Sequence, residues 1–420
     1  MLTKITDFCQ PLLLQLFLSV VLCPSLVLAN DWPQWQGPNR DGLSAETGLL
    51  KSWPEGGPPL VWLFRDCGKG YAGPAIADGH LYILGSRDGK TFAIALNTAT
   101  GEEIWSTELG PKLTNRWGDG PRSTPTVDGN RVYVMTGHGT LAALRTGDGQ
   151  LIWQKSMADL GGSTPGWGYC ESVLIDGEAV LCTPGGEAGA VAALNKYTGA
   201  LLWQSTEVAD GAQYASIVKI NAPTGPQYIQ LLEKRVIGIS TSDGSLLWEA
   251  SWPGSTAVVP TPICHDNLVY VTSGYGAGCM LQQLNPDGTV TEVYRNKLMK
   301  NQHGGAIRVG DFVYGYSDGT GWLCHDLRIG KQAWRERDAF GKGAIGYADG
   351  MLYCLDEQTG TVVLIEASPE AWIEHGRFTL EPQTEIRSPS GGIWVHPVIA
   401  NGKLYLRDQE FLFCYDVKAN

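Results

Sequence analysis

The chain has 420 residues, a formal net charge of −12 at pH 7 and only 18% charged residues. This balance argues against a nucleic-acid partner, because binding phosphates needs a clustered basic face and the sequence has no run of Lys or Arg. With 54 Gly and 15 Trp, the composition is typical of many short strands joined by frequent turns, and predicts an all-β protein.

Residues 1–29 have the layout of a secretory signal peptide. A lysine precedes an apolar stretch over 11–22, and Val27-Leu28-Ala29 forms a small-residue cleavage site. We therefore expect export to the periplasm or the cell surface after cleavage near Ala29, and no transmembrane segment in the mature chain. A membrane anchor is the alternative, although the apolar stretch is shorter than the roughly 20 residues that a bilayer requires. Lipid attachment at Cys23 is also left open.

Residues 30–57 form a Pro- and Gly-rich segment that begins DWPQWQGPNRDG. Its three tryptophans, Trp32, Trp35 and Trp53, are too many large aromatic side chains to leave in water. The segment is therefore predicted to be an ordered clasp lying across the remainder of the chain. Residues 58–420 are predicted to form one domain.

A ten-residue phrase with a Gly-centred turn recurs, and in most copies Trp follows that Gly by four residues. The copies are LNTATGEEIW (96–105), LRTGDGQLIW (144–153), LNKYTGALLW (194–203), ISTSDGSLLW (239–248), a degenerate LNPDGTVTEV (284–293) and HDLRIGKQAW (325–334). A repeat of about 45 residues indicates one supersecondary unit used several times.

A strand-turn-strand pattern with an Asp-Gly, Gly-Asp or Asn-Gly turn precedes the phrase. It is found at 75–84, 126–135, 174–182, 262–271, 306–315, 345–354 and 398–406, and between Tyr214 and Ile239 with a longer predicted hairpin loop. Together with the two strands of the phrase, each copy gives a four-stranded antiparallel unit, which is one propeller blade. The pattern predicts an eight-bladed β-propeller.

The two ends of the chain predict how the ring closes. The last unit, 398–417, supplies three inner strands, whereas 58–66 is an isolated outer strand with Trp62 at the repeat position. If this strand completes the last blade, next to residues 411–415, the ring has no open sheet edge. A seven-bladed ring with one unit looped out and an open solenoid are the alternatives.

The eight cysteines after Ala29 include no CxxC pair and no adjacent pair. Cys182, Cys324, Cys354 and Cys414 lie in apolar strand-like segments, which favours small buried core residues over disulfides. Oxidation of some of them after export is left open.

The phrase [LN]-x-x-x-[TD]-G-x-x-x-W resembles the tryptophan-docking repeat of propellers related to pyrroloquinoline quinone (PQQ) dehydrogenases, and the resemblance covers residues 58–417. Stretches 301–319 and 396–416 resemble the exported PQQ-like repeat proteins of planctomycete-type bacteria, which are often described as BamB-like. The resemblance implies the propeller fold strongly and a function only weakly.

The chain departs from the quinone enzymes of this group. They carry a vicinal disulfide over the quinone, and this sequence has no Cys-Cys. They also bind calcium through a Glu, an Asn and an Asp, and the candidate carboxylates Glu171, Glu187 and Asp210 have no matching Asn-Asp pair. We therefore expect no cofactor, with PQQ and calcium as the alternative.

Candidate binding residues are those that come just before each innermost strand, because these segments meet at one mouth of a propeller. They combine flat aromatic rings with one cation, one carboxylate and two imidazoles: Tyr71, Arg122, Trp167, Tyr169, Glu171, Tyr214, His303, Trp394 and His396. Ordinary packing of the channel is the competing interpretation. Arg116, Trp117 and Asp119, in a long loop at 109–122, are secondary candidates.

No metal site or catalytic group is predicted. His303 and His396 are expected to lie about three blades apart, with no HxH or HExxH spacing between them. Glu171 next to Ser172 has no GxSxG elbow or Ser-His-Asp arrangement to support a nucleophile. The sequence thus predicts a monomeric binding scaffold of the cell envelope for a small ligand or an envelope protein. A quinone- or metal-dependent oxidoreductase and a BamB-like assembly factor are the alternatives.

Overall fold

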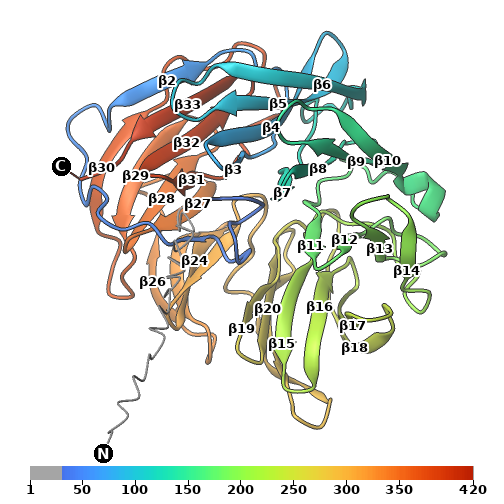
Figure 1. The fold of residues 1–420 in the computed structure, drawn as a ribbon. Helices are drawn as coiled ribbons and strands as arrows, with labels where there is room; N and C mark the ends of the chain where they lie inside the picture. Colours follow the sequence, from blue (N-terminus) through green and yellow to red (C-terminus); the bar gives the residue numbers. More distant parts are fainter. Residues whose placement is uncertain (1–30, 420) are drawn as a thin grey trace, which may run out of the picture.

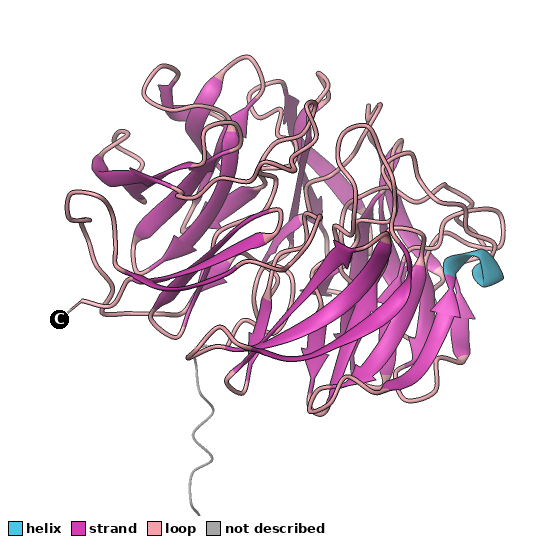
Figure 2. Cartoon of the chain, turned by 90° about the horizontal axis from the view of Figure 1, so that it is seen from above, coloured by secondary structure: helices cyan, strands magenta, loops and turns pink. Residues whose placement is uncertain are grey.

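The computed structural model describes residues 31–419, which form eight β-sheets arranged in a ring (Figure 1). Within each sheet, consecutive strands of the chain pair antiparallel. Figure 2 shows the ring from above, with one short 3-10 helix, η1 (Met157–Leu160), among the described residues. The protein is an all-β, eight-bladed β-propeller, as predicted from the repeats.

The blades are numbered in chain order. Blades 1 to 4 consist of β3 (Ala75–Ala77), β4 (His80–Arg87), β5 (Lys90–Asn97) and β6 (Glu103–Pro111); β7 (Thr126–Asp128), β8 (Arg131–Met135), β9 (Thr140–Arg145) and β10 (Leu151–Ser156); β11 (Leu174–Asp176), β12 (Ala179–Cys182), β13 (Ala192–Asn195) and β14 (Leu201–Gln204); and β15 (Val218–Ala222), β16 (Gly225–Leu231), β17 (Arg235–Ser240) and β18 (Leu246–Ser251).

Blades 5 to 8 complete the ring. They consist of β19 (Ile263–His265), β20 (Leu268–Ser273), β21 (Gly278–Leu284) and β22 (Val290–Asn296); β23 (Ala306–Val309), β24 (Phe312–Ser317), β25 (Gly321–Asp326) and β26 (Gln332–Glu336); β27 (Gly343–Ala348), β28 (Met351–Asp356), β29 (Thr361–Glu366) and β30 (Glu374–Thr379), extended by β1 (Leu43–Ser44); and β31 (Val398–Ala400), β32 (Lys403–Asp408) and β33 (Phe411–Asp416) with β2 (Leu60–Phe64).

Blade 8 joins the two ends of the described chain. Strand β2 pairs antiparallel with β33, and Trp62 lies opposite Cys414. In Figure 1 the blue strand β2 lies beside the red strand β33. The predicted closure is confirmed, which rules out the looped-out and solenoid alternatives.

Outer-strand tryptophans of blades 8, 1, 2 and 3 pack against the next blade. A Cβ placed on Gly101 of blade 1 would lie 2.6 Å from the Trp62 ring, and the Trp62 Nε1 donates to the Thr98 carbonyl at 2.9 Å. Glycine is needed at this turn for two reasons. A Cβ would clash with the Trp62 ring, and the φ of 74° lies in the left-handed region that favours glycine. The same ring-on-glycine contact recurs at Trp105 on Gly149, Trp153 on Gly199 and Trp203 on Gly244.

Blades 4, 5 and 7 depart from this contact. In blade 4 the Trp248 Nε1 donates to the Gln227 side-chain carbonyl of its own sheet at 2.7 Å. In blade 5, where the sequence repeat is degenerate, Tyr294 packs against Gly330, and its hydroxyl donates to the Leu327 carbonyl at 2.7 Å. In blade 7 the outer-strand position is Gly376, and the side chain of Trp53 from the N-terminal segment fills it; a Cβ at Gly376 would lie 2.9 Å from the Trp53 Cβ. The N-terminal segment thus supplies the aromatic ring that blade 7 lacks.

Blade 4 corrects one detail of the sequence prediction. The expected longer hairpin loop is instead a two-residue turn between longer strands, because pairing continues to Ala222 opposite Gly225. Gly225, with a φ of 116°, allows the chain to turn at that point.

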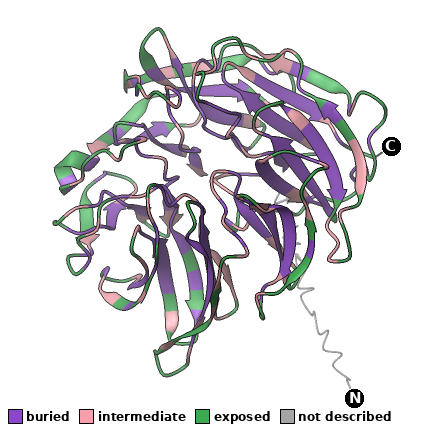
Figure 3. Cartoon of the chain, turned by 180° about the vertical axis from the view of Figure 1, so that it is seen from behind, coloured by how far each residue is buried: buried purple, intermediate pink, exposed green. Residues whose placement is uncertain are grey.

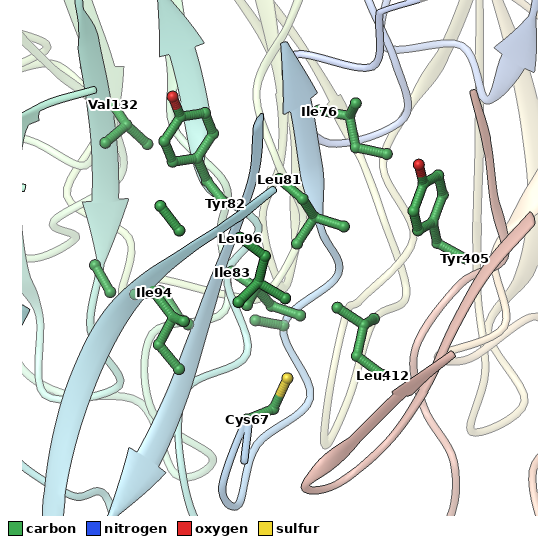
Figure 4. Close-up of a cluster of buried hydrophobic side chains, with 14 of the residues drawn as sticks. Cys67, Ile76, Leu81, Tyr82, Ile83, Ile94, Leu96, Val132, Tyr405 and Leu412 are labelled. Atoms are coloured by element: carbon green, nitrogen blue, oxygen red, sulfur yellow. The ribbon is translucent and has the colours of Figure 1, made fainter. Parts of the chain in front are cut away.

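The core lies between neighbouring blades. Figure 4 shows one such cluster, in which Ile76, Leu81 and Ile94 of blade 1 pack with Val132 of blade 2 and Leu412 of blade 8. In Figure 3 the inner strands are mostly buried, whereas exposed residues gather on outer strands and loops. The eight cysteines in residues 31–419 are all unpaired in this structure, and six of them are buried.

The first part of the N-terminal segment, residues 31–44, crosses the central channel. Trp32 bridges Ile76 in blade 1, and the Pro33 carbonyl accepts from the Val127 N–H of blade 2 at 2.7 Å. Arg40 is buried and donates to the Ser172 and Val173 carbonyls before blade 3, at 2.6 and 2.9 Å. Strand β1 then pairs parallel with β27. This channel segment closes one end of the channel.

Candidate functional site

A cavity of about 410 Å³ occupies the channel, and every blade contributes to it. Most of the lining residues come from the segments that lead into the innermost strands, as the repeat pattern predicts for one mouth of a propeller. These include Tyr71 before β3, Trp167 before β11 and Trp394 before β31. We refer to this cavity as the funnel.

One wall of the funnel is a continuous column of stacked groups. The Arg122 guanidinium lies 4.8 Å from the centre of the Tyr71 ring. The Tyr71 and Trp394 rings are 5.1 Å apart at 31°, and the Trp394 and His303 rings are 4.6 Å apart at 26°. The His303 Nδ1 lies 3.5 Å from the Glu357 carboxylate. The column therefore runs from a cation through two aromatic rings and an imidazole to an anion.

Blades 3 to 5 line another part of the funnel with aromatic rings. Trp167 meets the Tyr214 ring edge to face at 5.6 Å, and the Trp167 N–H donates to the Tyr214 hydroxyl at 3.4 Å. Tyr275, in the turn between β20 and β21, is 45% exposed. Its φ of 53° is unusual for a bulky residue and costs free energy on the order of 1–3 kcal/mol.

Arg122 is the cation of the funnel that lacks an acidic partner among residues 31–419. Its Nε donates to the Trp167 carbonyl at 2.9 Å, and its Nη2 donates to the Gly118 carbonyl at 2.8 Å. By contrast, the Lys342 Nζ is paired with Asp318 at 2.9 Å. A positive charge held by carbonyl groups and an aromatic face can receive an anion from the cavity.

The channel segment forms the floor of the funnel. Trp35 and Gln36 line the cavity, and the Trp35 Nε1 donates to the Thr261 hydroxyl at 2.9 Å. The Trp35 ring also meets the His396 ring edge to face at 4.7 Å. The funnel is therefore closed below, and a ligand would enter at the other mouth.

Seven of the nine candidate residues line the funnel: Tyr71, Arg122, Trp167, Tyr214, His303, Trp394 and His396. Tyr169 and Glu171 do not. Tyr169 is buried between blades 2 and 3, where its hydroxyl donates to the Pro184 carbonyl at 3.0 Å. Trp167, two residues earlier, lines the cavity, so this irregular segment does not alternate strictly, and Tyr169 faces away from the cavity.

Glu171 forms part of the wall behind the funnel. Its carboxylate accepts from the Thr183 N–H at 2.6 Å and from the Thr183 hydroxyl at 3.0 Å. Burial raises its pKa to about 7, and the two Thr183 hydrogen bonds and the charge of Arg40 oppose the rise. The residue contributes to the packing of blade 3 and is not available to a ligand in the cavity.

The two histidines are in contact, which corrects the expectation that they lie about three blades apart. The His396 Nε2 donates to the His303 carbonyl at 2.7 Å. The residues precede blades 8 and 6, and the narrow channel brings them together. Burial lowers the pKa of His396 to about 4, so its imidazole is neutral at neutral pH. Among residues 31–419, no group of three or more His, Cys, Asp or Glu side chains is arranged to hold a metal ion.

Of the secondary candidates, Trp117 lines the funnel, and the Arg116 guanidinium lies 4.9 Å from the Trp117 ring centre. Asp119 is paired with Lys112 at 2.9 Å and with Lys69 at 3.6 Å. Trp117 can therefore contact a ligand, whereas Asp119 holds the loop in place.

Sequence reasoning missed Tyr275, Lys342 and Glu357, which also line the funnel. Tyr275 and Glu357 lie in turns between the second and third strands of their blades. Antiparallel pairing brings these turns to the same mouth as the segments that lead into the innermost strands, but no local motif identifies them as lining residues. Lys342 directly precedes β27, so the rule that found the other candidates could have found it.

The fold is an eight-bladed β-propeller, and the funnel lies on its axis. The family model described as "Outer membrane protein assembly factor BamB" matches residues 53–165 and 90–336. The chain belongs to this family.

Curated relatives come from two kinds of protein. Outer membrane protein assembly factor BamB of Moranella endobia (strain PCIT) is 27% identical over 219 residues, which cover 51% of this chain and 52% of that protein. BamB of Legionella pneumophila (strain Paris) is 29% identical over 52% of this chain and 51% of its own length. Quinoprotein alcohol dehydrogenase PedH of Pseudomonas putida is 28% identical over 35% of this chain and 25% of its length. The chain spans about half the length, or less, of these relatives.

Solved structures resemble the fold. BamB from Moraxella catarrhalis matches with a TM-score of 0.59 and 16% identity, over 83% of this chain and 94% of that chain. Quinohemoprotein alcohol dehydrogenase from Comamonas testosteroni matches with a TM-score of 0.60 and 11% identity, over 93% and 81%. At these identities the likeness concerns the propeller alone. Within residues 31–419, no helix is both long and apolar enough to cross a membrane.

Proposed function

We propose that the protein is an exported binding protein of the cell envelope whose funnel holds a small ligand. Export rests on the signal-peptide layout of residues 1–29. The binding function rests mainly on one observation, the stacked column of Arg122, Tyr71, Trp394 and His303. This column faces a cavity that Trp35 closes at one end. A concave site with aromatic walls and a few fixed polar groups is the usual form of a small-molecule site.

The residues of the funnel do not fit a calcium-bound quinone. Calcium takes six to eight oxygen ligands, usually with several carboxylates among them. Glu357 is the carboxylate that lines the funnel within residues 31–419, and it lies beside the His303 imidazole. Two adjacent cysteines are also absent from the sequence. We therefore favour binding without quinone chemistry.

A purification experiment tests the binding function. The processed protein is incubated with the low-molecular-mass fraction of an envelope extract, washed and denatured, and the released compounds are identified by mass spectrometry. Ser390 is exposed at the mouth of the funnel, so Ser390→Trp should block entry without disturbing the core. Ser163, which is exposed and outside the lining, provides the matched Ser163→Trp control.

The wild-type protein and Ser163→Trp are expected to release the same compound, and Ser390→Trp to release none. Release of the same compounds by all three proteins would show that the funnel is not the binding site.

Assembly of outer-membrane proteins is a second candidate function, favoured by the family match over residues 53–336. Pull-down from a solubilised envelope tests it, with an Arg122→Ala, Tyr71→Ala double variant as comparison. An envelope protein that binds the wild-type chain, and is lost with the double variant, would make the funnel a protein-binding site. Equal capture by both would place the partner on another surface.

A further inference from the structure

We propose that the ligand is an acidic sugar: a pyranose ring that carries one carboxylate. This inference rests on the proposed binding function and specifies the chemistry of the same funnel. Three features of the cavity carry it, namely its aromatic faces, its neutral hydrogen-bonding groups and its single cation without an acidic partner.

The aromatic faces suit a flat ring whose edges are polar. Tyr71 and Trp394 present rings on one wall, and Trp167, Tyr214 and Tyr275 on the part contributed by blades 3 to 5. The faces of aromatic rings are electron-rich, and the C–H bonds on one face of a pyranose carry partial positive charge, so the two stack. The volume of about 410 Å³ lies toward the lower end of the range for small-molecule sites, roughly 300–1,000 Å³.

The remaining lining favours a ligand with many hydroxyl groups over an aromatic acid. It contains the neutral polar side chains Gln36, Ser172, Ser216, Thr261, Gln302 and Gln358. The Ser172, Ser216 and Thr261 hydroxyl oxygens already accept N–H groups of the protein, at 2.9, 3.0 and 2.9 Å. Each hydroxyl keeps its own O–H as a donor. An aromatic ligand would bury these groups without partners, which costs about 1–3 kcal/mol for each group.

Arg122 supplies the site for one negative charge. A guanidinium has five N–H donors, and two of its nitrogens bond to the Trp167 and Gly118 carbonyls. Lys342 adds no second site of this kind, because Asp318 pairs with it at 2.9 Å, and the Glu357 carboxylate lies at the opposite end of the stacked column, beyond His303. The molecule as a whole carries a formal charge of −12, so an unpaired cation in its channel is the feature that an anionic ligand needs.

Titration calorimetry tests this inference with defined probes. D-Galacturonate and D-glucuronate are compared with D-galactose and D-glucose, which lack the carboxylate, with glucose 6-phosphate and with benzoate. Arg122→Gln removes the charge, and Arg116→Gln removes an exposed charge that lies outside the lining. Thermal unfolding of each variant shows that it is folded.

At least one uronate is expected to bind the wild-type protein about tenfold or more tightly than its neutral sugar, a difference of about 1.4 kcal/mol. Arg122→Gln should remove this preference and leave the weaker affinity for neutral sugars, while Arg116→Gln keeps it. The proposal is overturned if neutral sugars bind as tightly as uronates, if glucose 6-phosphate or benzoate binds more tightly, or if no probe binds.

The result can be separated from the fate of the proposed function. If an extract compound is captured and Ser390→Trp abolishes the capture, the funnel is a ligand site whatever the sugars do. If the uronates do not bind while the extract compound is captured, the ligand class is rejected and the funnel remains the binding site. Failure of both experiments rejects both.

Discussion

The Trp394 indole lies on the His303 imidazole, with ring centres 4.6 Å apart and planes 26° apart. The two residues lead into different blades, 8 and 6, and the hydrogen bond from His396 to the His303 carbonyl fixes their relation at 2.7 Å. The wall of the funnel is thus built by contacts between blades and not by one loop. A ligand meets a surface that is already formed, which limits the free energy spent on ordering.

Replacing Trp394 with Ala should weaken ligand capture. The substitution removes the central ring of the column, so Tyr71 and His303 lose their shared partner. We expect at least about a fivefold loss of affinity for the compound captured from extract, because one stacked aromatic contact contributes about 1 kcal/mol. Trp372→Ala, at a half-buried tryptophan outside the funnel lining, is the control. Unchanged binding by Trp394→Ala would show that the stacked column is not part of the binding site.

Trp62→Ala should destabilise the whole ring. Trp62 closes blade 8 onto blade 1 through Gly101 and the Thr98 carbonyl. Removing a large buried aromatic side chain costs about 3–5 kcal/mol of the free energy of unfolding, which denaturant titration measures. Trp117→Ala, at a partly exposed tryptophan in a loop, should cost much less. Equal costs would contradict the closing role of Trp62.

Gly376→Ala should destabilise blade 7, although it adds a single methyl group. The new Cβ would lie 2.9 Å from the Trp53 Cβ, and the Gly376 φ of 140° is unfavourable for alanine. We expect a loss of about 1–3 kcal/mol, as for other overpacked sites. Gly350→Ala, where a Cβ would meet open space at a φ of 79°, separates backbone strain from crowding. If both variants lose the same stability, Trp53 does not occupy the blade 7 position.

His325 should make the protein less stable in acid. It is fully buried, its Nδ1 donates to the Asp326 carbonyl at 3.1 Å, and its Nε2 accepts from the Tyr270 hydroxyl at 3.0 Å. Burial lowers its pKa from 6.5 to about 4, so the unfolded chain binds the proton more readily. The stabilisation is fully present above pH 6.5 and is lost as the pH falls toward 4, by about 3 kcal/mol. His325→Gln should flatten this decline in unfolding titrations, and an unchanged slope would contradict the assignment.

The ionisation of Glu171 should make the protein less stable as the pH rises, which is opposite to the effect of His325. Burial raises its pKa from 4.5 to about 7, so the folded protein binds the proton more readily than the unfolded chain. Its contribution to stability is fully present below pH 4.5 and is lost as the pH rises through 7, by about 3 kcal/mol. Glu171→Gln should therefore gain stability relative to the wild-type protein as the pH rises. A difference in melting temperature that stays constant across this range would refute the buried ionisation.

The eight-bladed ring could be predicted from the sequence because the pattern that indicates one blade recurs along the chain. The Gly-to-Trp spacing recurs in most blades, and the outer strand at Trp62 matches the strand missing from blade 8. The places where another residue takes the position of the repeat tryptophan could not be predicted. Trp53 is distant in sequence from Gly376, and only the folded ring brings the two together.

The funnel was predictable to the extent that it follows the repeat. Residues leading into the innermost strands reach one mouth, which placed Tyr71 and Trp394 correctly in the lining. The side to which a residue points was less predictable, because irregular segments lack a strict alternation, and Tyr169 faces the core. Tyr275 and Glu357 come from other turns, and the contact between the two histidines depends on the width of the channel.

The position of a bound sugar tests the central claim most directly. A crystal structure of the protein with D-galacturonate should show its ring against Tyr71 and Trp394, with the carboxylate on the Arg122 guanidinium. A sugar bound outside the funnel, or a funnel that stays empty at saturating galacturonate, would contradict the account.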